Sequence, residues 1–217
     1  MKKILLLSLG ATLLFSGCDK ESLGVSSIIS YPAVKVLGDQ FMTVAAGSTY
    51  IDAGCLATEG TTDITSTAVT TGTVDTNTPG VYIITYSAQN VNGTASKSRY
   101  VGVIDATASA MDISGRYRRN AGALGYATIT KTSYPGMYIN NNPGGVDLNP
   151  APPTVAPAPI PIYMFHWTAT KIGAPAQSSS VGTFACTNGV YDSVNLLYKW
   201  VCVNSGYGTA LRTFIKQ

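Results

Sequence analysis

The side chains that most often perform chemistry are few and scattered in this sequence. Its only histidine, His166, has no second histidine with which to share a zinc ion. Paired carboxylates are a common means of hydrolysing glycosidic bonds, and no pair is present. The four carboxylates after residue 104 stand singly between turn-forming residues: Asp105, Asp112, Asp147 and Asp192. We therefore predict that this protein is not an enzyme and uses no metal and no cofactor.

Aromatic side chains are the remaining candidates for a ligand site, and they concentrate in residues 111–217. Exposed Trp and Tyr rings can stack on sugar rings while nearby polar groups bind the hydroxyls. Tyr138, which precedes three asparagines, and Trp167 and Trp200 are the candidate ligand-binding residues. The alternative is that these rings form the core, because antiparallel sheets are rich in aromatic residues.

Three of the four cysteines follow residue 50. Cys186 and Cys202 lie in one β-rich stretch and could form a disulfide, which the chain-entropy model values at about 3 kcal/mol. Cys55 is then left over and is expected to be a small buried hydrophobe.

The N-terminus has the pattern of an export signal. Lys2 and Lys3 precede an apolar run over residues 4–15. A run of this length is shorter than the ~20 residues that span a membrane, and it fits the apolar region of a signal peptide. We assign residues 1–17 to a signal peptide.

The sequence Leu14-Phe15-Ser16-Gly17-Cys18 resembles the bacterial lipobox. The resemblance implies a diacylglycerol on the Cys18 thiol and fatty acids such as palmitate, which together anchor the chain in a membrane. Residues 18–30 would be a flexible tether. The charges at Asp19, Lys20 and Glu21 resemble the export tag of Bacteroidota lipoproteins, which implies display on the outer face of the outer membrane; an orientation toward the periplasm is the alternative.

The balance of charge argues against nucleic acid as a partner. The formal charge of +3 includes Lys2 and Lys3, so the chain after residue 17 carries about +1 and has no dense basic stripe. Arg116, Arg118 and Arg119 form one basic cluster that could contact anionic sugars or lipid headgroups. The interpretation we favour is a solvated strand edge that discourages aggregation.

Residues 31–104 contain alternating apolar and polar runs separated by Gly, Asn and Pro turns. Residues 81–88 form the strongest predicted strand, and Asn92-Gly93 is a hairpin candidate. Strands and turns at this spacing predict a β-sandwich.

Two runs in this region resemble a known family. Residues 44–54 fit V-x-x-G-x-x-Y-x-D-x-G, and residues 72–82 fit G-x-V-D-T-x-x-P-G-x-Y, followed by the T-Y-x-A strand at 85–88. These motifs are similar to the bacterial Ig-like domain of pesticidal crystal proteins and of many Bacteroidota surface lipoproteins. The resemblance implies an Ig-like β-sandwich that acts as a spacer. In it Gly47, Gly54 and Gly80 would supply turns, and Tyr82 and Tyr86 would anchor the core.

Residues 105–110 are expected to be a linker, and residues 111–217 a second, C-terminal β domain. Its opening, Asp112-Ile113-Ser114-Gly115, resembles an uncharacterised module that follows such Ig units. Predicted strands favour an antiparallel meander or small barrel, and they cover residues 127–131, 136–140, 162–171, 181–186, 196–203 and 209–215. The Pro-rich segment 140–161 is expected to be an exposed loop.

The sequence thus predicts an all-β, membrane-anchored lipoprotein. The first functional hypothesis is a binding or accessory module, for polysaccharide, in nutrient capture. The second is a structural lipoprotein that docks an envelope protein.

Overall fold

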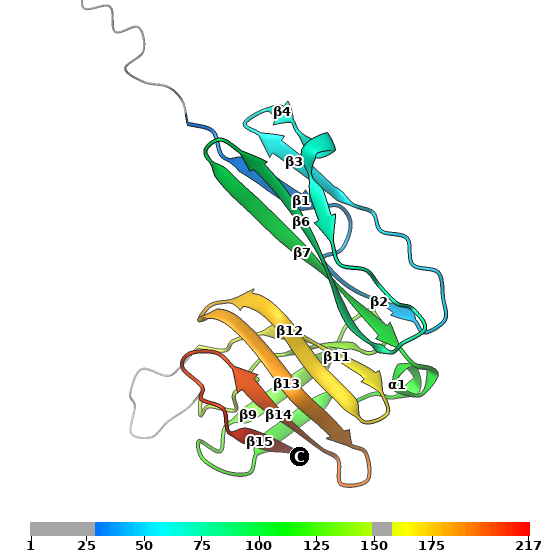
Figure 1. Cartoon of the computed structure of the whole chain (residues 1–217). Coiled ribbons are helices and arrows are strands. Elements are labelled where there is room, and N and C mark those ends of the chain that lie inside the picture. Colours follow the sequence, from blue (N-terminus) through cyan, green and yellow to red (C-terminus); the bar gives the residue numbers. More distant parts are fainter. Residues whose placement is uncertain (1–28, 149–157) are drawn as a thin grey trace, which may run out of the picture.

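The computed structural model describes residues 29–148 and 158–217. It is all-β apart from one short α-helix and one 3-10 turn, and it has two units: a sandwich (residues 32–104) and a barrel (residues 115–216) (Figure 1). The signal peptide, Cys18 and most of the tether lie outside the described residues. None of the helices within the described ranges is long and apolar enough to cross a membrane.

The sandwich contains two sheets, with strand orders β1-β3-β4 and β2-β7-β6-β5. Strand β2 pairs with β7 in parallel, and all the other pairs in the sandwich are antiparallel. Its elements are β1 (Pro32–Val36), β2 (Phe41–Ala45), β3 (Cys55–Glu59), β4 (Thr62–Asp63), the 3-10 turn η1 (Thr65–Thr67), β5 (Val69–Thr71), β6 (Gly80–Asn90) and β7 (Gly93–Ile104).

Strands β6 and β7 form the long hairpin of the sandwich, as the sequence predicted. In β6, Ile84, Tyr86 and Ala88 are buried at every second position, which is the period of a strand with one face in the core. At the tip, Asn90 Oδ1 accepts hydrogen bonds from the backbone N–H groups of Asn92 and Gly93, at 2.9 and 3.0 Å. In Figure 1 this tip and the first described residues lie at the end of the sandwich far from the barrel.

The family glycines have different roles in the structure. Gly47 and Gly54 have φ of 78° and 76°, which side chains other than glycine rarely adopt. Gly80 was expected to supply a turn of the same kind, but it begins strand β6 and has no positive φ. Its place is beside the ring of Tyr82, whose Cε2 would lie 3.8 Å from an added Cβ.

Polar groups bind one another in the sandwich core around Arg99, which is 1% exposed. The Arg99 guanidinium pairs with Asp52 and donates to the carbonyl of Leu37. Tyr86 donates to both oxygens of Asp52 at 2.6 and 2.7 Å. Tyr86 is fully buried and anchors the core, as predicted, whereas Tyr82 is only half-buried.

The second unit is a closed barrel, which decides between the meander and the barrel expected from the sequence. Every neighbouring pair is antiparallel, and the pairing of β15 with β8 closes the ring. Its strands are β8 (Gly115–Arg119), β9 (Tyr126–Lys131), β10 (Met137–Asn140), β11 (Ile162–Thr168), β12 (Lys171–Ser179), β13 (Gly182–Asp192), β14 (Leu197–Val203) and β15 (Leu211–Lys216).

The basic cluster does not occupy a strand edge, which corrects the interpretation made from the sequence. Strand β8 carries all three arginines, and it is hydrogen-bonded to β15 on one side and β9 on the other. Arg116 is exposed and lies over the Tyr126 ring, 3.6 Å from its centroid. Arg118 lies 5.6 Å from the same centroid. A closed barrel leaves no edge for these charges to protect.

The Pro-rich segment was predicted to be an exposed loop, and its first part is buried instead. Residues 142–145 enter one end of the barrel, where Pro143 O accepts a hydrogen bond from the indole of Trp200. Gly144 O accepts from Arg212 Nη1 at 2.8 Å. Residues 149–157 lie outside the described residues.

The expected linker is ordered as helix α1 (Ala106–Ala110). Asp105 caps the helix, because its carboxylate accepts a hydrogen bond from the backbone N–H of Ala108 at 2.6 Å. The side chain of Ala108 is fully buried, so the connection between the two units is a packed element.

Candidate functional site

The sandwich and the barrel meet on the outer face of strand β11. Successive side chains of a strand point to opposite faces, so Tyr163, Phe165 and Trp167 form one outward row. Phe165 is fully buried, because β7 passes over it at Gly102. An added Cβ at Gly102 would lie only 2.5 Å from the Phe165 ring. Tyr163 and Trp167, at the two ends of the row, are half-buried.

Hydrogen bonds hold the two units together at separate points of this interface. Asp105 N, at the start of the helix, donates to Trp167 O at 3.0 Å. Side chains join the units through Tyr100 Oη to Ala176 O at 2.8 Å, Thr43 Oγ1 to Pro135 O at 2.8 Å, and Tyr134 Oη to Asp39 Oδ2 at 2.5 Å. The walls of any groove at this interface are therefore fixed before a ligand arrives.

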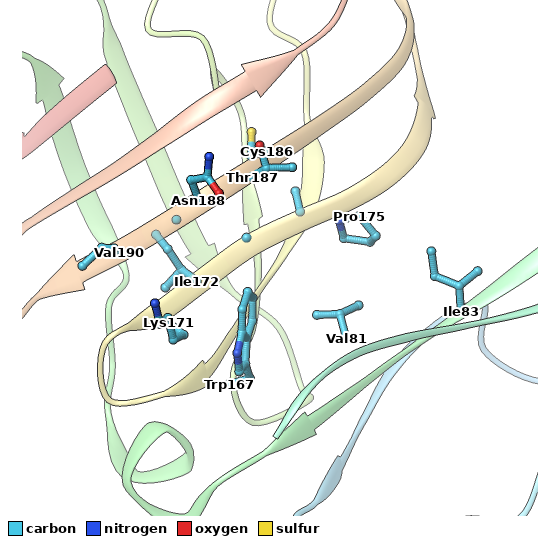
Figure 2. Close-up of a pocket in the computed structure, with 13 residues that line it drawn as sticks. Val81, Ile83, Trp167, Lys171, Ile172, Pro175, Cys186, Thr187, Asn188 and Val190 are labelled. Atoms are coloured by element: carbon cyan, nitrogen blue, oxygen red, sulfur yellow. The ribbon is translucent and has the colours of Figure 1, made fainter. Parts of the chain in front are cut away.

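The Trp167 end of the row opens into a groove of about 740 Å³, which we call the Trp167 groove. One wall is strand β6 of the sandwich, with Val81 and Ile83, and the other wall comes from β12 and β13 of the barrel. Figure 2 shows the Trp167 ring standing between these walls, beside Ile172. The volume of the Trp167 groove falls within the range of small-molecule sites, about 300–1,000 Å³.

Glycines and a strand irregularity shape the floor of the Trp167 groove. The ring of Trp167 lies against Gly173, where an added Cβ would be 3.1 Å from the ring. Strand β13 shifts register between Thr187 and Val190, and Asn188 there has a φ of 53°. Gly189 has no room for a side chain, since a Cβ would lie 2.1 Å from Ile172 O. This bulge turns Thr187 and Asn188 into the lining of the groove.

The Trp167 groove combines an apolar surface with a few polar groups. Trp167, Ile172 and Pro175 supply the apolar surface, and Lys171 and Asn188 supply an ammonium and an amide. No acidic residue is among the described residues that line it. Such a groove suits a ligand with one apolar face and hydroxyl or acidic groups at its edge.

Two of the three predicted ligand residues are core residues, which corrects the sequence-based assignment. Trp200 and Tyr138 are both 0% exposed inside the barrel. The Trp200 indole donates to Pro143 O at 2.9 Å, and the Tyr138 hydroxyl donates to Met111 O at 3.0 Å. Neither ring can stack on a sugar without unfolding the barrel. Of the three, only Trp167 lines a groove.

His166 points into the barrel and is fully buried. Burial lowers the pKa of its imidazole, more than its contact with Ala169 O at 3.3 Å raises it. Its Nδ1 has no hydrogen-bond partner within the described chain, and its ring meets Tyr191 edge to face. Among the described residues, no group of three or more His, Cys, Asp or Glu side chains could hold a metal ion.

Cys186 and Cys202 are brought together by the barrel. They are directly opposite in the β13–β14 pair, and both are buried as free thiols. Burial raises the pKa of Cys186, whereas contact with Cys186 and then the charges of Arg212 and Arg119 lower that of Cys202. The predicted disulfide between them stays a prediction. Cys55 is a half-buried free thiol in the sandwich.

Sequence reasoning missed most of the groove. Val81 and Ile83 belong to the other unit, and no pattern in the sequence places them near Trp167. The Asn188-Gly189 pair, just after the predicted strand 181–186, was the one available signal, because an Asn-Gly pair interrupts the regular pairing of strands.

Comparisons with known proteins bear on the sandwich. Residues 34–103 match the family model described as "Bacterial surface protein, Ig-like domain". No curated protein matches the chain. Among solved structures, the lipoprotein BT2262 from Bacteroides thetaiotaomicron is similar, with 24% identity and a TM-score of 0.38 over 86% of this chain and 100% of that one. The sandwich, by its match to the family model, is an Ig-like domain of the type found in bacterial surface proteins.

Proposed function

We propose that this protein is a lipid-anchored surface lipoprotein that binds a glycan in the Trp167 groove. The Ig-like sandwich acts as the spacer, since its first described residues lie at the end far from the barrel (Figure 1). A tether entering at that end would hold the Trp167 groove away from the membrane.

The observation that carries this proposal is the position of Trp167. Its ring is backed by Gly173 and is half-buried in a groove of about 740 Å³. An aromatic face of this kind can stack on the C–H face of a sugar ring, while Lys171, Thr187 and Asn188 bind its hydroxyls. Because packing already holds the ring, binding costs little side-chain entropy.

The carboxylates of the barrel support a role in binding without catalysis. Asp105 caps helix α1, and Asp112 lies 3.8 Å from the ammonium of Lys131. Asp192 accepts hydrogen bonds from Val194 N and Asn195 N, both at 3.0 Å, in the turn after β13. These three groups serve local structure, and none of them lines the Trp167 groove.

A second candidate function is docking of an envelope protein. Ile83 and Val190, which line the Trp167 groove, are 42% and 40% exposed. Exposed apolar groups at the rim of a groove also suit a protein partner. Co-purification of a partner from membranes, together with no response to sugars, would favour this function over glycan binding.

The test is a glycan-array and affinity-gel screen of the full chain in detergent, followed by titration of tryptophan emission. Of the two tryptophans, Trp200 is buried in the barrel, so a shift on binding would report Trp167. We expect saturable binding to a glycan, together with a change in tryptophan emission that Trp167→Ala abolishes. Val194→Ala, at an exposed position that does not line the groove, is the control and should bind as the wild type does. Absence of binding to plant, host and microbial glycans would overturn the proposal.

A further inference from the structure

A second groove opens at the other end of the aromatic row on β11. It lies between the β2 edge of the sandwich and strands β9, β10 and β11 of the barrel, with a volume of about 510 Å³. We call it the Tyr163 groove. The buried contact of Phe165 with Gly102 separates it from the Trp167 groove, so one sugar ring cannot occupy both.

The floor of the Tyr163 groove is a fixed aromatic surface. The ring of Phe41 stacks between Tyr100 and Tyr163, with centroid distances of 4.6 and 4.3 Å. The backbone of Tyr163 is also held, because the Gln177 amide donates to its carbonyl at 2.8 Å and accepts from its N–H at 2.9 Å. Ile139 extends this surface from the next strand. The Tyr163 ring is therefore oriented before any ligand binds.

Polar atoms without protein partners surround this floor. Asp39 uses Oδ2 to accept from Tyr134, and its Oδ1 accepts no hydrogen bond from any described residue. Gln40 donates its amide to Ser98 O, which leaves its Oε1 unbonded within the described chain. The hydroxyls of Ser133 and Tyr163 likewise have no partner there.

Charges of both signs line the Tyr163 groove. Asp39 is an exposed carboxylate, and Lys131 brings an ammonium that is only loosely paired with Asp112 at 3.8 Å. Opposite charges at one rim favour neither a strongly cationic nor a strongly anionic ligand. They suit a neutral molecule whose hydroxyls donate to the carboxylate and accept from the ammonium.

We propose that the Tyr163 groove is a second saccharide site, for a neutral sugar ring with two adjacent hydroxyls. The apolar face of the ring lies on Tyr163, one hydroxyl donates to Asp39 Oδ1, and a neighbouring hydroxyl contacts Gln40 or Lys131. The inference rests on the proposed glycan-binding function and adds to it. Two sites on one rigid interface would bind a branched or repeating glycan with an avidity beyond that of either site.

The experiment separates the two grooves by their readouts. The full chain in detergent is titrated with methyl glycosides of glucose, galactose, mannose and N-acetylglucosamine. Ligand-observed saturation-transfer NMR detects binding anywhere, whereas tryptophan emission reports the Trp167 groove. We expect Trp167→Ala to abolish the emission change and to leave an NMR signal from the Tyr163 groove. This remaining NMR signal reports the affinity of the sugar for the Tyr163 groove. In the double variant Trp167→Ala/Asp39→Asn that affinity should fall about tenfold or more, since a hydrogen bond to a charged group is lost.

A matched control is available on the sandwich. Asp63→Asn removes another exposed carboxylate, in strand β4, which lies at the end of the sandwich away from the barrel (Figure 1), and it should leave both signals unchanged. If Trp167→Ala abolishes the NMR signal as well, the second site is refuted while the proposed function stands. If the wild-type chain gives the NMR signal without an emission change, and Asp39→Asn weakens it, the Tyr163 groove stands and the assignment to Trp167 fails. Absence of any signal from these sugars refutes the second site.

Discussion

Trp167 and Trp200 differ in what each ring contacts, and that difference predicts that truncation destabilises the protein to different extents. Trp200 packs against Tyr198 and Phe214, and its indole N–H satisfies Pro143 O. Trp200→Ala should lower the free energy of unfolding by about 3–5 kcal/mol, because it leaves a core cavity and removes the indole hydrogen bond to Pro143 O. Trp167→Ala should cost about 1–2 kcal/mol, as expected for a half-buried side chain.

Guanidinium unfolding followed by far-ultraviolet circular dichroism measures both values. Trp200→Phe is a useful third variant, since it keeps an aromatic ring in the core but loses the hydrogen bond and part of the volume, and it should cost less than Trp200→Ala. If Trp167→Ala destabilised the protein as much as Trp200→Ala, Trp167 would be a core residue and its place in the groove would be wrong.

The surroundings of Asp52 predict that the sandwich loses stability in acid. Burial alone would raise the pKa of this carboxyl, but hydrogen bonds from Tyr86 and Tyr50 and the charge of Arg99 outweigh it and lower the pKa. The unfolded chain then binds the proton more tightly than the folded one, so this contribution to stability is present at neutral pH. It is lost as the pH falls below about 4, where the unfolded carboxyl titrates.

Unfolding free energies measured between pH 7 and pH 3 check this prediction. Asp52→Asn should lower stability at pH 7 and flatten its decrease toward acid, because the titrating group is gone. Asp75 has a pKa lowered by hydrogen bonds from Thr78 and Asn77 on an exposed turn. Asp75→Asn is the comparison variant: the Asp75 carboxyl is exposed and has no charged partner among the described residues, so its replacement should flatten the slope less than Asp52→Asn does. A slope unchanged by Asp52→Asn would contradict the prediction.

At the residue scale, the family motif and strand alternation identify some of the core residues but not their partners. The family motif identified Tyr86 as an anchor, yet nothing in the motif named Arg99, whose charge the Asp52 carboxylate needs. Trp200 could have been assigned to the core, since strand alternation puts it on one face with Tyr198 and Cys202, opposite Lys199. Trp167 could not be placed, because its partners belong to the other unit.

At the scale of elements, strand β12 shows why some strands of the barrel could not be predicted from the sequence. Gly173 and Pro175 interrupt strands, so a single strand was predicted over residues 162–171 and none beyond. The structure ends β11 at Thr168 and returns along β12, which shifts register between Ala174 and Gln177. The Gln177 amide takes over both backbone hydrogen bonds of Tyr163, so the strand tolerates its proline.

The pairing of β13 with β14 places Cys186 and Cys202 where they can form a disulfide. Directly opposed residues of antiparallel strands have Cα atoms about 4.5–5.5 Å apart, within the range of a disulfide. Cys186 and Cys202 occupy such positions. In an oxidising compartment we expect them to form a disulfide that raises the free energy of unfolding by about 3 kcal/mol. It would also fix the strand just before the bulge that lines the Trp167 groove.

Peptide mass spectrometry without reduction tests whether the bond forms in protein exported by a bacterial cell. Thermal unfolding with and without dithiothreitol measures its contribution. Cys55→Ala is the control and should leave the effect of the reductant unchanged. Two free thiols in the exported, folded protein would contradict the prediction, and Cys202 would then keep its hydrogen bond to Pro143 O.

At the scale of the whole molecule, the first described residues and the grooves lie at opposite ends of the sandwich (Figure 1). Residues 1–28 are outside the described structure, so lipidation of Cys18 stays a prediction. We expect the wild-type chain to partition into the detergent phase of a Triton X-114 separation and Cys18→Ala to move to the aqueous phase. Intact-mass spectrometry should show the added acyl groups. A wild-type chain in the aqueous phase would refute the anchor.

The arrangement of the two units could not be predicted from the sequence. Alternation and turn signals predicted a sandwich and a β-rich second domain, because those patterns are local. Both grooves depend instead on contacts between residues more than sixty positions apart, such as Gly102 with Phe165. Neither residue is conspicuous in the sequence, because Gly102 is a glycine within a strand and Phe165 is one of several aromatic residues in its strand.

We therefore expect a side chain at Gly102 to disturb the packing between the two units. An added Cβ would lie 2.5 Å from the Phe165 ring and 3.1 Å from Thr43 Cγ2, so Gly102→Ala should cost about 1–3 kcal/mol through overpacking. If the contact with Phe165 is the cause, the cost should shrink in a Phe165→Ala background, which a double-mutant cycle measures. Gly206→Ala, where a Cβ meets only the Asn204 side chain at 3.5 Å, is the control. A full, additive cost in both backgrounds would show that close packing of Gly102 against Phe165 is not the cause of the destabilisation.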